Sequence, residues 1–444
     1  MKLFNIIVIL IFLQGCSFDS KTGIWKDNSN SEEIKDKDNV FKDFESVKTN
    51  NIISFKEIIQ IEDNFKFFSI SPVVNNSWYD VFYKKNNIYD NFVYNNLNQI
   101  NLKSKKFSRN KIDSGILYTN NRIITADIKG NIIVYSEKEK KIVNKYNFYK
   151  KKFKTIKKKL NIQINDNLLY VSDNLGFIYA YDYVNNKIKW AKKYKVPFRS
   201  NIKIEKNKIF LADQNNNLLV VDKKNGDILR EFPTEEVLVK NNYENNLASN
   251  GKNLFFLNTF GTVYSIDLNN LKINWFINVN TFLNQNLSNL FYAKTIKVLN
   301  NKLVILTNSN LNILDATNGS ILFQKPISGK TQTLITEKYI FLVNNNNLLI
   351  SIDFNTGKII YSNEITSKIS EFLNTKKNKI NIKSIYIINN ELYIYLHNSY
   401  IVKFNLYGEI SDIQKLSIKI KSNPIFIKKS MLYLDNKNRL VILD

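Results

Sequence analysis

The stretch LLVVDKKNG at residues 218–226 returns as LNILDATNG at 311–319 and as LISIDFNTG at 349–357. Each copy is an apolar run followed by Asp, three further residues and Gly. An Asp carboxylate accepts hydrogen bonds from backbone N–H groups two residues on, and Gly adopts the positive φ that closes a tight turn without a Cβ clash. The repeated stretch therefore predicts a strand that ends in a turn, with the acid and the glycine serving turn formation rather than catalysis.

Weaker copies of this strand end extend the repeat along the chain. They place Asp182, Asp267, Ser136, Asn405 and Asp444 at the position of the acid, with Asn186 in the glycine slot of the copy at Asp182. The eight markers are spaced 38 to 52 residues apart, which suits one four-stranded propeller blade per marker. We therefore predict an all-β fold, an eight-bladed β-propeller. An open solenoid of the same repeats is the alternative.

Ring closure has to involve the N-terminal side of the domain. Segments such as 168–172, 262–266 and 392–396 are rich in β-branched and aromatic residues, as strands are. The last unit stops at Asp444, where its outer strand should begin, and an unpaired edge invites aggregation. We expect a closing strand within residues 92–103.

The N-terminus has the features of an export signal. An apolar run at 3–12 follows Lys2 and leads into Leu13-Gln14-Gly15-Cys16. The run is about half of the roughly 20 residues that a spanning helix needs. The tetrapeptide resembles the bacterial lipoprotein signal, in which the Cys is lipidated and the chain is cut before it, although Gln14 stands where a smaller residue is usual. An ordinary secretory signal is the alternative.

These features predict three regions. Residues 1–15 are expected to be a lipoprotein signal peptide, 16–60 the lipidated Cys16 and a polar, flexible tether, and 61–444 the propeller with its N-terminal closing strand. Cys16 is the only cysteine, so no disulfide can form within the chain.

The chain is strongly basic, with a formal net charge of +25. Its lysines are spread through segments rich in Lys, Asn and Ile, as at 150–152 and 157–159, without an aromatic platform or an Arg-rich helix. This pattern favours solvated strand faces, leaves attraction to anionic lipid head groups open, and predicts no nucleic-acid partner.

The inventory of catalytic side chains is poor. His397 is the only histidine, and the sequence has none of the spacings typical of a Ser-His-Asp, His-Glu-x-x-His or Cys-x-x-Cys site. Clustered imidazole ligation of zinc or copper needs several histidines. We therefore expect no enzyme activity, no cofactor, no catalytic residue and no metal site, and we interpret His397 as a turn residue.

The repeat resembles the propeller repeat of pyrroloquinoline-quinone enzymes, in which a Trp follows the Asp and the Gly. Trp190 and Trp275 keep this Trp, whereas Phe323 and Tyr361 replace it in other units, so contacts between blades must there rely on other aromatic residues. A lipoprotein with this repeat resembles the BamB family of the outer-membrane β-barrel assembly machinery. The resemblance implies a non-catalytic scaffold at the periplasmic face of the outer membrane, anchored by lipid, whose partner is the BamA-like central barrel protein.

One loop carries the implied partner site. Pro197-Phe198-Arg199-Ser200 resembles a Pro-Leu-Arg-Ser-like loop of that family, whose Leu-Arg pair meets the periplasmic domains of the barrel protein. Phe198 and Arg199 are therefore expected to bind the partner, with Phe198 as an exposed apolar knob. The alternative is an ordinary loop with Phe198 buried and Arg199 paired. The acidic pair Glu235-Glu236 aligns too loosely with the family to be assigned.

Two other functions stay open. A lipid-anchored periplasmic propeller can bind another envelope ligand, such as a glycan, a peptide or a polymer, through loops that no motif reveals. A quinone-dependent oxidoreductase shares the repeat, but this chain has no vicinal cysteines and its repeated Asp residues are accounted for by turns.

Overall fold

The computed structural model describes residues 16–18, 25–27, 55–149, 153–236, 244–280 and 291–444. The chain divides into two units, 1–51 and 52–444. In the first unit, β1 (Cys16–Phe18) pairs antiparallel with β2 (Trp25–Asp27) through their backbones. The predicted signal peptide lies outside the described residues. The second unit contains all other described elements.

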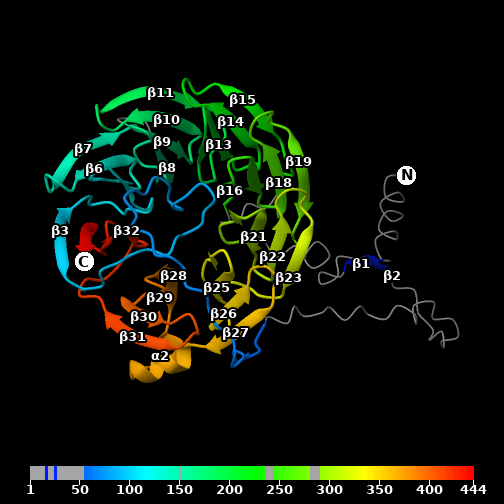
Figure 1. Cartoon of the computed structure of the whole chain (residues 1–444). Helices are drawn as coiled ribbons and strands as arrows, with labels where there is room; N and C mark the ends of the chain where they lie inside the picture. Colours follow the sequence, from blue (N-terminus) through cyan, green and yellow to red (C-terminus); the bar gives the residue numbers. More distant parts are fainter. Residues whose placement is uncertain (1–15, 19–24, 28–54, 150–152, 237–243, 281–290) are drawn as a thin grey trace, which may run out of the picture. The chain divides into compact units, whose positions relative to one another are not determined.

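The second unit is a ring of four-stranded antiparallel sheets, with the first strand of each sheet innermost (Figure 1). Blade 1 contains β4 (Leu117–Thr119), β5 (Arg122–Ala126), β6 (Asn131–Ser136) and β7 (Lys141–Asn147), and blade 2 contains β8 (Leu160–Asn165), β9 (Leu168–Asp173), β10 (Phe177–Asp182) and β11 (Lys187–Lys193). Blade 3 contains β12 (Lys203–Glu205), β13 (Lys208–Ala212), β14 (Leu218–Asp222) and β15 (Ile228–Phe232), and blade 4 contains β16 (Asn246–Ser249), β17 (Asn253–Leu257), β18 (Thr262–Asp267) and β19 (Ile273–Asn278).

Blades 5 to 8 complete the ring. Blade 5 contains β20 (Lys297–Leu299), β21 (Lys302–Leu306), β22 (Leu311–Asp315) and β23 (Ile321–Lys325), and blade 6 contains β24 (Leu334–Ile335), β25 (Tyr339–Val343), β26 (Leu348–Asp353) and β27 (Ile359–Glu364). Blade 7 contains β28 (Ile382–Ile388), β29 (Glu391–Leu396), β30 (Tyr400–Phe404) and β31 (Ile410–Lys415), and blade 8 contains β32 (Ile425–Ile427), β33 (Ser430–Leu434), β34 (Arg439–Leu443) and β3 (Ile100–Lys106). The prediction of an all-β, eight-bladed β-propeller is confirmed.

The repeated acids are turn residues, as the sequence predicts. Each of the eight markers ends or directly follows the third strand of a blade. Asp222 accepts hydrogen bonds from the backbone N–H groups of Lys224 at 2.7 Å and Asn225 at 3.3 Å. Gly226 has a φ of +79°, and Asn186, which replaces the glycine in blade 2, has a φ of +56°. The carboxylates are thus engaged by the turns that they close.

The glycines of these turns also dock the blades onto one another. A Cβ built on Gly226 would lie 2.8 Å from the ring of Trp190, which projects from the outer strand of the preceding blade. The indole N–H of Trp190 donates to the carbonyl of Lys223 in the same turn, at 3.0 Å. Trp275, Phe323 and Tyr361 lie in the same way against Gly319, Gly357 and Gly408. The aromatic replacements therefore keep the contact, although a benzene ring lacks the indole N–H.

Closure occurs through an N-terminal strand. β3 pairs antiparallel with β34 and supplies the fourth strand of blade 8. The strand begins at Ile100, later than the sequence suggests. Phe92 instead makes parallel bridges with Val73 and Ile388. The segment before β3 therefore has a different task.

Residues 73–95, here named the plug, cross the middle of the ring (Figure 1). Hydrogen bonds join the plug to the innermost strands of seven blades. Backbone examples are Trp78 to Tyr118 at 2.8 Å and Phe92 to Ile387 at 3.1 Å. At the remaining blade, blade 6, Ile88 of the plug shares a buried cluster with Ile335 of β24. The plug thus ties the inner ends of all eight blades together.

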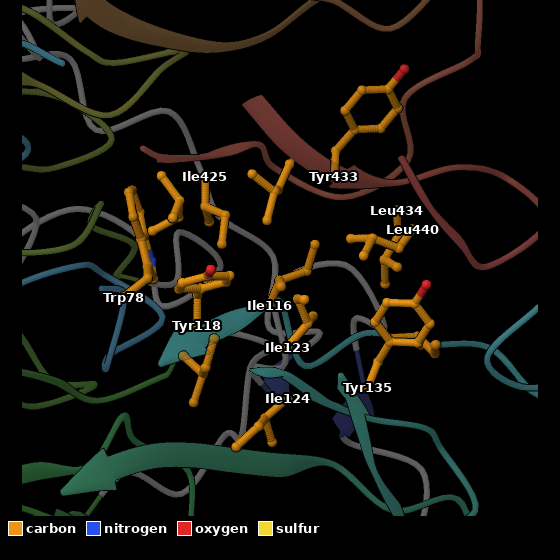
Figure 2. Close-up of a cluster of buried hydrophobic side chains, with 14 of the residues drawn as sticks. Trp78, Ile116, Tyr118, Ile123, Ile124, Tyr135, Ile425, Tyr433, Leu434 and Leu440 are labelled. Carbon is orange, nitrogen blue, oxygen red and sulfur yellow. The ribbon is translucent and has the colours of Figure 1, made fainter. Parts of the chain in front are cut away.

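The plug is part of the hydrophobic core. Trp78 is 2% exposed and belongs to one buried cluster with Tyr118 of blade 1 and Ile425 of blade 8 (Figure 2). The rings of Trp78 and Phe92 are 5.5 Å apart, and Phe92 stacks on Phe426 at 5.2 Å. Burial of such large rings stabilises the fold by roughly 2–3 kcal/mol per side chain.

The chain before the plug lies on the outside of blades 6 and 7. The N–H of Phe55 donates to Pro326, Ile59 bridges to Ser362, and Phe67 packs edge-on against Tyr339 at 4.8 Å. Two short helices, α2 (Thr366–Phe372) and η1 (Lys377–Lys379), connect these blades. In the described part of the chain, no helix has the length and apolar character to span a membrane.

Candidate functional site

The loop 197–200 lies between blades 2 and 3 and is held by the backbone on both sides. The N–H of Arg199 donates to Ala212 at 3.0 Å, and its carbonyl accepts from the N–H of Asn245 at 3.0 Å. The hydroxyl oxygen of Ser200 accepts from the N–H of Ala212 at 2.7 Å. Arg199 itself is half-buried. The loop therefore presents Arg199 from a fixed backbone position.

Phe198 does not form an exposed knob. Its side chain is 2% exposed, belongs to the core cluster with Ile202 and Leu211, and meets the ring of Tyr194 edge-on at 5.6 Å. The expectation of an exposed aromatic residue at 198 is wrong, because the bridge to Asp213 turns this position into the groove between blades. The role of the loop in partner binding remains a prediction, with Phe198 supporting Arg199 from beneath.

The structure also places the other polar residues singled out by the sequence. Glu235 accepts hydrogen bonds from Tyr264 at 2.6 Å, Asn258 at 2.7 Å and Thr262 at 2.8 Å. Burial opposes ionisation, but these bonds outweigh it and hold the pKa of Glu235 below its usual value. Glu235 thus fastens a loop to blade 4, whereas Glu236 is exposed. His397 is exposed in the turn after β29.

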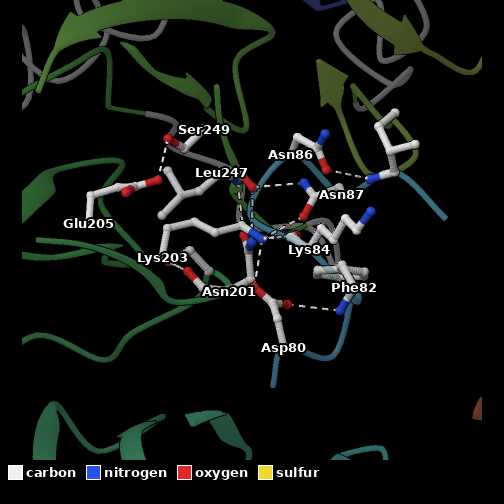
Figure 3. Close-up of polar contacts among 12 residues, drawn as sticks. Asp80, Phe82, Lys84, Asn86, Asn87, Asn201, Lys203, Glu205, Leu247 and Ser249 are labelled. Carbon is white, nitrogen blue, oxygen red and sulfur yellow. Dashed lines mark hydrogen bonds and ion pairs between the residues drawn. The ribbon is translucent and has the colours of Figure 1, made fainter. Parts of the chain in front are cut away.

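The most deeply buried ion pair among the described residues joins the plug to blade 3 (Figure 3). The Lys203 amine lies 2.6 Å from a carboxylate oxygen of Asp80, and the two side chains are 0% and 4% exposed. The amine also donates to Asn87 Oδ1 at 2.6 Å and to the carbonyl of Lys84 at 3.1 Å. Burial lowers the pKa of Lys203, and Asp80 opposes that shift.

Asn87 continues this polar junction across the channel. Its side-chain amide donates to the carbonyl of Leu247 at 2.9 Å and to that of Ile296 at 2.8 Å, which places it between blades 4 and 5. Lys85 adds an ion pair to Glu205 at 2.7 Å, and Glu205 also accepts from Ser249 at 2.7 Å. Buried polar groups hold a unique arrangement when every member is paired. The plug is therefore positioned by specific contacts and not by apolar packing alone.

The plug separates two cavities of the central channel. One, of about 620 Å³, lies at the end of the channel where the first strand of each blade turns into the second, and is lined by Tyr83, Lys84 and Asn86 of the plug. The other, of about 910 Å³, lies at the opposite end and is lined by Trp78, Phe82 and Tyr89. No residue lines both cavities. The channel is thus divided at the level of the plug.

Among the residues that the structure describes, no three His, Cys, Asp or Glu side chains lie close enough to hold a metal ion. The acids near the channel are committed to structure: Asp127, for example, accepts from Ser108 at 2.5 Å and from Asn131 at 2.8 Å.

Sequence reasoning missed the plug and its buried pair. The signal that was present is the aromatic density of WYDVFYKKNNIYDNFVY at 78–94, which lies outside the repeat. Asp80 and Lys203 are 123 residues apart in the chain. No local pattern indicates that they meet.

Comparison with known proteins agrees with the repeat analysis. The family described as "Outer membrane protein assembly factor BamB" matches residues 147–363, which run from the end of β7 to β27. Over these residues the chain is similar to the BamB family. The resemblance predicted from the repeats and the propeller is thereby confirmed, and the BamB-like loop 197–200 falls inside the matched region.

Solved structures share this fold at low identity. BamB from Moraxella catarrhalis is 13% identical, with a TM-score of 0.60 over 77% of this chain and 99% of that one. The computationally designed Ika8 protein is 9% identical, with a TM-score of 0.57 over 78% and 99%. Sqt1 of Saccharomyces cerevisiae is 7% identical, with a TM-score of 0.54 over 78% and 97%. No curated protein sequence matches. At these identities, the structural likeness of the BamB-like chain concerns the fold alone.

Proposed function

We propose that this BamB-like propeller is a non-catalytic scaffold of the outer-membrane β-barrel assembly machinery. It docks through the loop 197–200 on the periplasmic domains of the BamA-like barrel protein. The match of residues 147–363 to the BamB family carries this proposal, because the matched region contains the loop.

The geometry of the loop suits docking. Both backbone groups of Arg199 are hydrogen-bonded, and Phe198 fills the core beneath it. A side chain presented from a rigid backbone loses less entropy when it binds. Arginine is also among the residues most enriched at interface hot spots, where truncation costs roughly 2 kcal/mol or more. We assign the docking contact to Arg199 and a supporting role to Phe198.

Anchoring completes the proposed mechanism. Lipid on Cys16, after removal of residues 1–15, holds the protein at the periplasmic face of the outer membrane. The tether predicted for 16–60 is the part before Phe55, where the described contacts with the propeller at 61–444 begin. A single acyl chain binds a membrane only reversibly, at about 0.8 kcal/mol per buried CH₂, so several chains are needed for a durable anchor. A tethered domain meets a partner in the same membrane at high effective concentration.

The test is co-purification with the barrel protein from membranes. Arg199→Glu reverses the charge at the proposed contact, and the matched control is Arg230→Glu, at an exposed position of β15 in blade 3. We expect recovery of the barrel protein to fall at least tenfold for Arg199→Glu and to stay unchanged for Arg230→Glu. Equal recovery with both folded variants would remove the assignment of the loop.

The anchor has its own test. Cys16→Ser should release the propeller from the membrane fraction into the soluble periplasmic fraction. Retention of the variant in the outer membrane would show that another feature holds the protein there.

A further inference from the structure

The larger channel cavity combines an aromatic end with a basic rim. Its closed end is formed by plug residues Trp78, Phe82 and Tyr89, together with Tyr386 of β28. Its volume of about 910 Å³ is within the range of sites that enclose a small ligand. Because the plug closes this end, an extended chain cannot pass through the ring.

The rim carries more positive than negative charge. Lys111, Lys157, Lys158, Lys159 and Lys421 line the cavity, against Asp113, Asp127 and Glu244. Lys111 pairs with Asp113 at 3.0 Å, and Lys159 pairs with Glu244. Lys157 and Lys421 have no carboxylate within ion-pair distance among the described residues.

Neutral contacts hold the amines of Lys421 and Lys383 in place. The amine of Lys421 donates to Asn438 Oδ1 at 2.8 Å. Lys383, just behind the rim, donates to the carbonyls of Lys421 at 2.5 Å and Ser422 at 2.9 Å. Burial lowers the pKa of Lys383 to about 8, so it is largely protonated at neutral pH. Ordered cations without an anionic partner favour an anionic ligand.

One polar group at the aromatic end is also unsatisfied. Trp78 is 2% exposed, and its indole N–H has no acceptor among the described residues. Lys297 of β20 does not line the cavity, but its amine lies 4.9 Å from the centroid of the Tyr89 ring, which does.

We propose that this cavity binds an apolar or aromatic group that carries a carboxylate, supplied by the C-terminal end of a polypeptide. The ring of the ligand stacks on the aromatic end, and its carboxylate lies among the lysines. A chain end fits because the cavity is closed at the plug, and a C-terminus fits because the rim repels an amino terminus. This inference does not depend on the docking role of Arg199.

The test is calorimetric titration of the purified full chain with an acetylated Ala-Val-Phe tripeptide. The free acid and the C-terminal amide differ only in the charge, and 3-phenylpropionate offers the same ring and carboxylate without a peptide. We expect saturable binding of the acid, about tenfold weaker binding of the amide, and weaker binding of phenylpropionate. Equal affinity of acid and amide, or no saturable binding of the acid, would overturn the proposal. Phenylpropionate binding as tightly as the tripeptide would overturn the chain-end assignment.

Variants locate the site. Replacing both Lys157 and Lys421 by Gln should weaken binding of the acid by about tenfold and leave binding of the amide unchanged. Tyr89→Leu should weaken both ligands. The matched control, Lys224→Gln, removes an exposed lysine from the turn after β14 and should change neither affinity. If the control and the double variant behaved alike in folded protein, the site would not be this cavity.

Discussion

Removal of the buried carboxylate at position 80 should release the plug without unfolding the ring. In Asp80→Asn, the Lys203 ammonium keeps its bonds to Asn87 and Lys84. It loses the one carboxylate that lies within ion-pair distance among the described residues. Breaking a buried ion pair by removing one partner costs about 3–5 kcal/mol. Because two neutral acceptors remain, we expect the lower value, about 3 kcal/mol, which corresponds to a roughly 150-fold shift of an equilibrium.

The assay is native-state hydrogen exchange, which measures local opening. The N–H of Phe92 donates to Ile387 at 3.1 Å, so it exchanges only when the plug leaves β28. We expect this amide to exchange roughly 150-fold faster in Asp80→Asn. The N–H of Leu342, within β25 of blade 6, should change little.

Two further variants serve as controls for the effect of the Asp80–Lys203 pair. Glu62→Gln removes the ion pair to Lys358, whose partners are 70% and 66% exposed, and should change exchange less than about threefold. Adding Lys203→Met to Asp80→Asn removes the orphaned charge and should recover part of the loss. A change below threefold at Phe92 in Asp80→Asn, or an equal change at Leu342, would show that the pair does not hold the plug.

Three other predictions concern the ring itself. Gly226→Ala should lower the free energy of unfolding by about 2–4 kcal/mol, because φ is positive and the new Cβ meets Trp190. Gly251→Ala, with a φ of +84° and open space around it, should lower the free energy of unfolding by only about 1 kcal/mol. Equal midpoints of urea unfolding for the two variants would contradict this. Phe198→Ala should cost about 3–5 kcal/mol in thermal unfolding, since it empties a core position, and a surface-like loss of a few tenths would show that the ring is not packed. Hydrogen bonds from Ser367 and Thr366 outweigh burial and lower the pKa of Glu364 to about 2, so its contribution is present above pH 4.5 and is lost as the pH falls toward 2. Unfolding of the wild type and Glu364→Gln should therefore differ at pH 7 and converge near pH 2, and a constant difference would refute the assignment.

The loop 197–200 and the channel cavity are formed by different parts of the propeller. Arg199 is presented from the connection between blades 2 and 3. The lysines that line the cavity come from the connections between blades 7 and 8, blades 8 and 1, and blades 1 and 2. A ligand in the cavity and a partner on the loop would therefore be bound by separate residues. The variants at 157, 421 and 199 test them separately.

The candidate site was predictable only where a family motif marks it. The loop 197–200 was found from its sequence, and its backbone is ordered as a docking loop requires. The burial of Phe198 was not predictable from the motif, because the same four residues are compatible with an exposed or an inward-facing ring. The bridge between Phe198 and Asp213, which directly follows β13, turns the ring inward, and the motif of four residues does not contain Asp213.

The strands, the turns and the number of blades are all predictable from the sequence. Each of these depends on residues within one repeat, such as Asp222 and Gly226, and the repetition of a local signal makes it readable. Tertiary structure alone decided what fills the channel. The Asp80–Lys203 pair, the aromatic end around Trp78 and the basic rim around Lys421 bring together residues that are far apart in the chain. Their meeting depends on the closed ring and on the path of the plug through it, and neither is encoded in the spacing of neighbouring residues.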